Sequence, residues 1–167
     1  YRIMSGLFQI HLEDVLVEIS GRGYQNAENS VLLEKEYNFD GKHVMLAEDV
    51  EINMEIMEYF MEAVGVRCTG VSNGKEALEC FENSSIGEFD AILLDINMPE
   101  MDGYETARAI RSSHREDGET VPIFAVSASA FLADVQEALQ AGMNGHIAKP
   151  IQTEVLYRTL SDVWEES

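Results

Sequence analysis

The chain has 167 residues, which is enough for one well-buried core with a small appendage and too few for two full domains. Hydrophobic residues make up 46% of it, as in globular rather than disordered proteins. The net charge of −20 argues against nucleic acid as a partner, because the phosphate backbone would be repelled. No stretch is long and apolar enough to span a bilayer, so we expect no direct membrane contact.

The two cysteines, Cys68 and Cys80, form no CxxC pair and have no histidine at metal-ligand spacing. We expect structural thiols in a reducing compartment, and no secretory signal opens the chain, so the expected location is cytoplasmic. The first residue is Tyr1 rather than Met, which indicates a fragment of a longer protein whose remainder could carry a membrane anchor.

Residues 1–40 differ from the rest and are expected to form an N-terminal extension. Apolar residues between Phe8 and Ile19 fit both the alternation of a strand and one face of a helix, so their period does not decide. The polar run GRGYQNAENS is typical of a linker, and Ser30 could cap a short helix through VLLEKEY. We interpret this part as the end of an upstream element followed by a connector.

From residue 41 onward, short apolar runs alternate with segments of helical spacing. The strand-like runs are 44–47, 66–71, 91–94, 123–126 and 146–148. The helical sets are Ile52, Ile56 and Phe60; Ala77, Leu78 and Phe81; Tyr104, Ala107 and Ile110; Phe131, Val135 and Leu139; and Leu156, Leu160 and Val163. Five strand–helix units in series predict an α/β fold, with a parallel sheet covered by helices on both faces.

The informative side chains directly follow the first, third, fourth and fifth of these apolar runs. They are Glu48 and Asp49, Asp95, Ser127, and Lys149. Each one alone would ordinarily be a turn former, a helix cap or a surface charge. Ligands of open α/β sheets bind at the carboxyl ends of the strands, however, so these side chains are expected to meet at one edge.

The chemistry of this set indicates a metal-dependent reaction. Three carboxylates at one edge repel one another unless a cation lies among them. Their oxygens are ligands that Mg²⁺ prefers, and Mg²⁺ keeps bound water and recruits phosphate oxygens. Lys149 and the hydroxyl of Ser127 would then donate to an anion on the metal. The set predicts phosphoryl transfer to a carboxylate, with Asp95 as the nucleophile.

Four motifs, AEDVEIN, LLDINMPEMDG, AVSASA and HIAKPI, occur in that order. With them, the chain from about Lys42 to Trp164 resembles a response-regulator receiver domain of two-component signalling. The resemblance implies a flavodoxin-like, doubly wound parallel sheet of five strands in the order 2-1-3-4-5. It also implies a receiver domain at 41–167 that is a phosphoacceptor switch and not an enzyme.

The resemblance assigns roles to individual residues. Asp95 would be the phosphoacceptor, and Asp49 and Asp95 would bind Mg²⁺ directly. Glu48 would act mainly through water, and the backbone carbonyl of Asn97 would complete the protein ligands. Lys149 would neutralise charge on the transferred phosphoryl group.

Two positions depart from the commonest pattern of the family. Ser127 stands where Thr is more usual, and it keeps the hydroxyl. His146 stands where many receivers carry a switching Tyr or Phe. We interpret its ring as partly buried against the last helix, with an inward swing on phosphorylation as the alternative. The Lys149–Pro150 bond resembles a cis peptide site of the family.

The stretches GKHVMLAEDVEINMEI and AGMNGHIAKPI are most similar to receivers of hybrid histidine kinases. The expected partners are a histidine kinase as phosphodonor, in the same chain or another, and a downstream phosphotransfer protein. Phosphorylation would switch the face formed by the fourth helix, fifth strand and fifth helix. The chain ends too soon after Trp164 for a DNA-binding domain, and a stand-alone regulator is the alternative to a hybrid kinase.

Three other interpretations fit less well. A haloacid-dehalogenase-type phosphohydrolase needs a second aspartate two positions after the first, where this chain has Asn97. A flavin-binding module of similar fold would carry a glycine-rich phosphate loop after the first strand, and none is present. A degenerate receiver that works without phosphate is disfavoured by the intact Asp49, Asp95, Ser127 and Lys149.

Overall fold

The computed structural model describes residues 36–129 and 131–165. The chain divides between Tyr37 and Asn38, and the description below concerns the second unit, Asn38–Ser167. The Ser30 cap and the open choice of strand or helix between Phe8 and Ile19 lie outside the described residues. The domain boundary after residue 40 stays a prediction.

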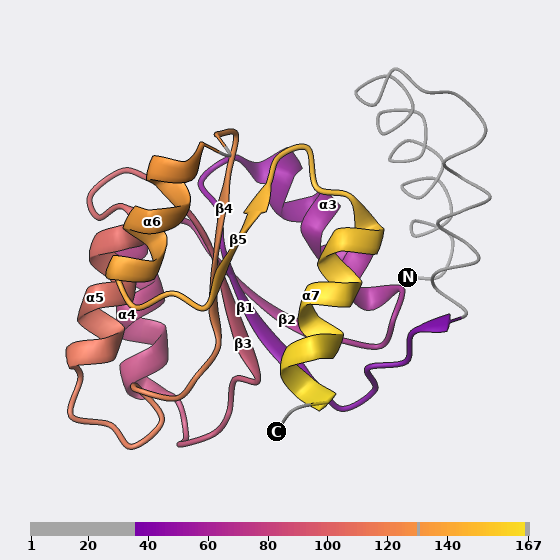
Figure 1. Cartoon of the computed structure of the whole chain (residues 1–167). Helices are drawn as coiled ribbons and strands as arrows, with labels where there is room; N and C mark the ends of the chain where they lie inside the picture. The colour runs from indigo at the N-terminus through magenta and orange to yellow at the C-terminus, as the bar shows by residue number, and fades with distance from the viewer. Residues whose placement is uncertain (1–35, 130, 166–167) are drawn as a thin grey trace. The chain divides into compact units, whose positions relative to one another are not determined.

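Every strand and helix predicted after residue 41 is present, in the predicted order (Figure 1). The strands are β1 (His43–Ala47), β2 (Arg67–Val71), β3 (Ala91–Asp95), β4 (Ile123–Ser127) and β5 (Gly145–Ala148). The helices are α3 (Glu51–Glu62), α4 (Gly74–Asn83), α5 (Gly103–Ser112), α6 (Leu132–Gln140) and α7 (Thr153–Glu165). Among the described residues, no helix has the length and apolar character needed to cross a membrane.

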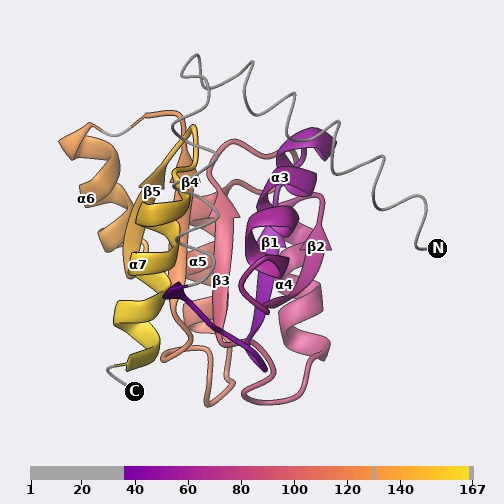
Figure 2. The ribbon, with the colours of Figure 1, turned by 90° about the vertical axis from the view of Figure 1, so that its right-hand side faces the viewer.

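All strand pairs are parallel, and the sheet order is β2-β1-β3-β4-β5, which confirms the expected fold (Figure 2). Helices α3 and α7 cover one face, while α4, α5 and α6 cover the other (Figure 1). Every residue of β1, β3 and β4 is buried, because helices shield these strands on both sides. This burial on both sides explains why the sequences of these three strands are almost entirely apolar.

Alternate residues of the strands supply the two halves of the core. Met45 and Ile92, for example, pack with Phe81 and Ile110 of the helices on the α4–α5 side. On the other side, the buried Tyr157 of α7 donates from its hydroxyl to the carbonyl of Phe60 in α3, at 2.6 Å. The two helices that cover this face are therefore joined by a hydrogen bond as well as by packing.

Helix α6 differs from the expectation that Phe131, Val135 and Leu139 form one face within a helix. Phe131 is the residue before the helix, and its side chain is 77% exposed. Leu139 is also exposed, and the residue of α6 that the helix buries is Ala138. The apolar period located the helix correctly. The large side chain of Leu139 faces outward, however, and the small Ala138 faces the sheet, which lets α6 lie close to it.

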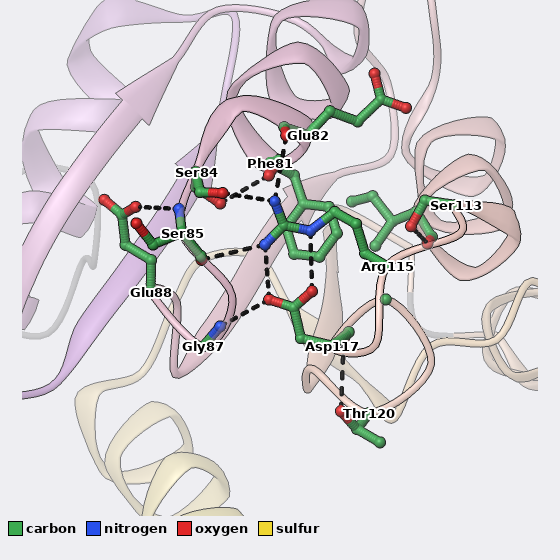
Figure 3. Close-up of polar contacts among 12 residues, drawn as sticks. Phe81, Glu82, Ser84, Ser85, Gly87, Glu88, Ser113, Arg115, Asp117 and Thr120 are labelled. Atoms are coloured by element: carbon green, nitrogen blue, oxygen red, sulfur yellow. Dashed lines mark hydrogen bonds and ion pairs between the residues drawn. The ribbon is translucent and has the colours of Figure 1, made fainter.

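A half-buried arginine, Arg115, connects two loops at the edge of the sheet where the strands begin. The guanidinium of Arg115 lies 4.5 Å from the ring centroid of Phe81, and two of its nitrogens bind Asp117 at 2.9 and 2.8 Å (Figure 3). It also donates to three carbonyls at the end of α4, those of Glu82, Ser84 and Ser85. The Asp117 carboxylate in turn accepts from the backbone N–H of Gly87.

Arg115 should therefore contribute far more to stability than an exposed arginine. Replacing it (Arg115→Ala) leaves Asp117 and several carbonyls without their donor, and we expect a loss of about 2–4 kcal/mol in the free energy of unfolding. The matched control is Arg158→Ala, whose side chain is 64% exposed in one pair with Glu154 and should cost about 0.5 kcal/mol or less. Urea unfolding followed by Trp164 fluorescence measures both, and equal losses would contradict this role.

Candidate functional site

Three carboxylates meet where β1 and β3 end. One oxygen each from Glu48, Asp49 and Asp95 lies within 4.8 Å of the other two. Glu48 directly follows β1 and Asp95 ends β3, and these two strands are neighbours, so the sheet itself places both side chains. Glu48 and Asp95 are buried, whereas Asp49 is exposed. The structure therefore brings together the acidic residues that the sequence placed at one edge.

Lys149 reaches this cluster from the end of β5. Its Nζ lies 2.7 Å from Oε2 of Glu48 and 3.4 Å from Oδ1 of Asp95. Its backbone N–H donates to the carbonyl of Ser127, and the Lys149–Pro150 peptide bond is cis, as the family resemblance implied. Within residues 36–129 and 131–165, no other lysine or arginine pairs with the three carboxylates.

The two buried carboxylates titrate differently. For Glu48 burial is the largest effect and acts upward, but hydrogen bonds from Lys149 and from the N–H of Val50 outweigh it and lower the pKa. For Asp95, burial raises the pKa from 3.8 to about 6, because the opposing charge of Lys149 is partly offset by that of Glu48. The ammonium of Lys149 lies closer to Glu48 than to Asp95, so the negative charge of Asp95 is only partly neutralised.

The start of α5 packs closely against the backbone that carries Asp95. Gly103 opens this helix, and a Cβ atom there would lie 2.6 Å from the carbonyl oxygen of Asp95. Asp102 and Glu105 form a reciprocal capping box that fixes the helix start beside the strand end. Glycine is thus required at 103, because any side chain would push α5 away from the site.

Ser127 is the last residue of β4, and His146 lies within the neighbouring strand β5. The Oγ of Ser127 is 2.8 Å from Nε2 of His146 and 2.8 Å from the carbonyl oxygen of Ser129. Ser127 is buried and His146 is half-buried. The ring of His146 thus already reaches the Ser127 hydroxyl in this structure, a contact that the sequence-based interpretation of ring packing did not include.

Two further features complete the site. Asn97 is exposed in the loop after β3, two residues beyond Asp95, where its backbone carbonyl was expected to serve a metal. The hydroxyl of Ser129 donates to Oδ2 of Asp134 in the first turn of α6, at 2.5 Å. Sequence reasoning did not find Asp134, and its position in the first turn of a helix after the AVSASA motif was the available signal.

Burial of the charged Asp95 carboxylate should destabilise the metal-free protein. Its pKa near 6 lies above the ordinary value of 3.8, so the folded state favours the protonated form, and stability declines as the pH rises through 6. At pH 7 in a chelating buffer, we expect Asp95→Asn to raise the free energy of unfolding by about 1–3 kcal/mol.

The difference between the two proteins should shrink toward zero near pH 4, where the wild-type carboxyl is also neutral. Denaturant melts of both proteins across this range provide the measurement. A gain that is independent of pH would show that the charge of Asp95 is not its cause.

The family model of the response regulator receiver domain matches residues 44–161. A hybrid signal transduction histidine kinase from Dictyostelium discoideum is 32% identical over 120 residues, which cover 71% of this chain and 7% of that kinase. Across the curated relatives, the chain spans between 6% and 14% of their length.

Solved structures agree with the family model. The receiver domain of a sensor histidine kinase from Pseudomonas aeruginosa, solved with a magnesium ion in its active-site cleft, is 38% identical. Its TM-score is 0.67, with 76% of this chain and 99% of that chain covered. A Saccharomyces cerevisiae receiver, solved with a histidine phosphotransfer protein, gives a TM-score of 0.65 at 25% identity, with 74% and 89% covered. This chain belongs to the response regulator receiver domain family.

Proposed function

We propose that this receiver domain accepts a phosphoryl group on Asp95 in a Mg²⁺-dependent reaction of a two-component phosphorelay. The observation that carries the proposal is the convergence of three carboxylates within 4.8 Å, with the Nζ of Lys149 3.4 Å from Asp95. One ammonium cannot balance three carboxylates, so the arrangement suits a divalent cation and a phosphoryl group that bind together.

The residues present fit magnesium. They offer hard oxygen ligands, and the raised pKa of Asp95 indicates negative charge that lacks a full partner. Asp49 and Asp95 would bind the ion directly, Glu48 through water, and Asn97 through its backbone carbonyl. The Pseudomonas receiver holds a magnesium ion in its active-site cleft, which supports this assignment. When bound, the ion neutralises negative charge on the phosphoryl oxygens.

The covalent step is a phosphoryl transfer between two side chains. An oxygen of the Asp95 carboxylate attacks the phosphorus of a phosphohistidine, the P–N bond breaks, and its electron pair stays on the imidazole, which takes up a proton. Lys149, beside Asp95, would donate to one phosphoryl oxygen, and the hydroxyl of Ser127 would donate to another. Positioning and charge neutralisation provide most of the catalysis.

The partners follow from this chemistry. The donor would be the phosphohistidine of a histidine kinase or of a phosphotransfer protein, the kind of protein bound to the Saccharomyces receiver. Relatives such as the Dictyostelium hybrid kinase support a place inside a hybrid sensor kinase, with residues 1–40 as the connector and the domain in the cytoplasm. A stand-alone regulator is the second candidate. Phosphorylation would then alter the surface formed by α6, β5 and α7.

Phosphorylation should depend on Asp95 and on magnesium. After incubation with phosphoramidate and Mg²⁺, intact-mass measurement should show one added phosphoryl group on the wild-type chain and none on Asp95→Asn. Asp162→Asn, which removes an exposed carboxylate near the end of α7, is the control and should be labelled like the wild type. A mass gain that persists in Asp95→Asn would overturn the assignment.

Magnesium binding should depend on the exposed member of the cluster. Asp49→Ala removes one direct oxygen ligand, and we expect the Mg²⁺ affinity to fall about tenfold or more. Glu79→Ala removes an exposed carboxylate on α4 and should leave the affinity within about twofold of the wild type. Isothermal titration with MgCl₂ gives both values. Equal affinities for Asp49→Ala and the wild type would show that the cluster does not bind the ion as proposed.

A further inference from the structure

The segment that leads into β1 packs against the last turn of α7. The rings of Phe39 and Trp164 meet edge to face, with their centroids 4.9 Å apart. The ammonium of Lys42 lies 5.3 Å from the centroid of the Trp164 ring. The backbone N–H of Phe39 also donates to the carbonyl of Val64, at 2.7 Å. Residues 38–42 are therefore held on the domain by aromatic packing, a cation–π contact and a hydrogen bond.

Asp90 connects this contact to the strand that carries the phosphoacceptor. Nε1 of Trp164 donates to the carbonyl of Asp90 at 3.1 Å, and Nζ of Lys42 lies 3.6 Å from Oδ1 of the same residue. Asp90 directly precedes β3, which ends at Asp95. We call Phe39, Lys42, Asp90 and Trp164 the clasp. The clasp joins the entry of the chain, the end of α7 and the start of β3.

Helix α7 extends from the phosphoacceptor site to the clasp. It runs from the edge of the sheet where the strands end to the edge where they begin, over about 20 Å (Figure 1). Residues 150–152 alone separate its first residue from Lys149, whose ammonium lies among the carboxylates of the site. Leu156 and Leu160 are fully buried along its inner side. Because closely packed interiors transmit displacements, a shift at the start of α7 should reach Trp164 at its end.

The proposed reaction would change the contacts of Lys149 at the start of this path. In the structure its Nζ lies 2.7 Å from Oε2 of Glu48. A phosphoryl group on Asp95 would draw the ammonium away from Glu48, and the short chain that leads into α7 would adjust. The clasp is closed while Lys149 contacts Glu48, so it belongs to the unphosphorylated state. A shift of α7 would loosen the edge-to-face packing of Trp164, which depends on the distance and angle of the two rings.

We propose that the clasp is a regulatory contact that couples the N-terminal connector to the phosphorylation state of Asp95, with α7 as the link. The inference rests on the proposed function of Asp95. Phosphorylation loosens the clasp and releases residues 38–42, through which the connector enters the domain. Coupling between two sites is reciprocal, so opening the clasp from the connector side favours phosphorylation to the same extent.

The first measurement is the affinity of the full chain, with Mg²⁺ present, for beryllofluoride as a phosphoryl mimic, from the ¹⁹F signal of the bound form. Phe39→Ala should tighten binding by about 2- to 10-fold, which is the range that loss of one aromatic pair from the resting state allows. In a Trp164→Ala background, Phe39→Ala should have no further effect, because the pair is already broken.

The control for this measurement is Arg115→Ala. It destabilises the domain at the same edge of the sheet, but the side chain of Arg115 binds Asp117 and the end of α4. Its beryllofluoride affinity should stay within about twofold of the wild type, so a gain that is confined to Phe39→Ala reports the clasp and not a general loss of stability.

The second measurement follows hydrogen exchange of residues 38–42 and begins with the wild-type chain. Beryllofluoride with Mg²⁺ should accelerate exchange of the Phe39 amide by about 2- to 10-fold, because this N–H leaves the carbonyl of Val64 when the clasp opens. Without any ligand, Trp164→Ala should accelerate it as well, since the ring that holds Phe39 is then gone.

The outcomes separate the coupling from the proposed function. Wild-type binding of beryllofluoride without faster exchange at Phe39 would overturn the coupling and leave the phosphoacceptor role intact. Equal or weaker binding by Phe39→Ala would overturn the coupling too. If the wild-type chain binds no beryllofluoride, the proposed function fails and the coupling fails with it.

Discussion

The contact between Lys149 and Glu48 is the interaction on which the rest of the site depends. The sheet order places the ends of β1 and β3 side by side, and two carboxylates are thereby buried next to each other. Lys149, at the end of β5, reaches past the ends of β4 and β3 to Glu48, which follows β1, at 2.7 Å. Burial raises the pKa of Asp95, and Lys149, which lies closer to Glu48 than to Asp95, offsets this effect only in part.

The remainder of the domain holds these destabilising charges in place. Helices on both faces bury the central strands, so the strand ends cannot move apart to relieve the repulsion. Gly103 allows α5 to pack against the Asp95 backbone. At the opposite edge, Arg115 and Asp117 join the loops that precede β3 and β4. Stability is thus concentrated away from the carboxylates, which is expected where function requires a destabilising charge.

The sequence predicted much of this fold, for physical reasons that differ between elements. The apolar runs of the sequence identified the buried strands. The expectation that these strands are parallel then placed Glu48, Asp95 and Lys149 at one edge of the sheet. The strand order came from the resemblance, because periodicity does not determine it. The orientation of α6 was not predictable, since an apolar period does not tell whether Leu139 or the smaller Ala138 faces the sheet. Hydrogen bonds such as His146 to Ser127 depend on rotamers and on neighbouring strands, so no local pattern reveals them.

We propose that Asp95, and no other carboxylate of the cluster, receives the phosphoryl group. An acyl phosphate on an aspartate is reduced by borohydride to homoserine with release of phosphate, so peptide mass spectrometry can locate it. After treatment with phosphoramidate and Mg²⁺, we expect homoserine at position 95 alone, and no homoserine when Mg²⁺ is left out. Homoserine at position 49, or no reduced residue in a chain that has gained the mass of a phosphoryl group, would contradict it.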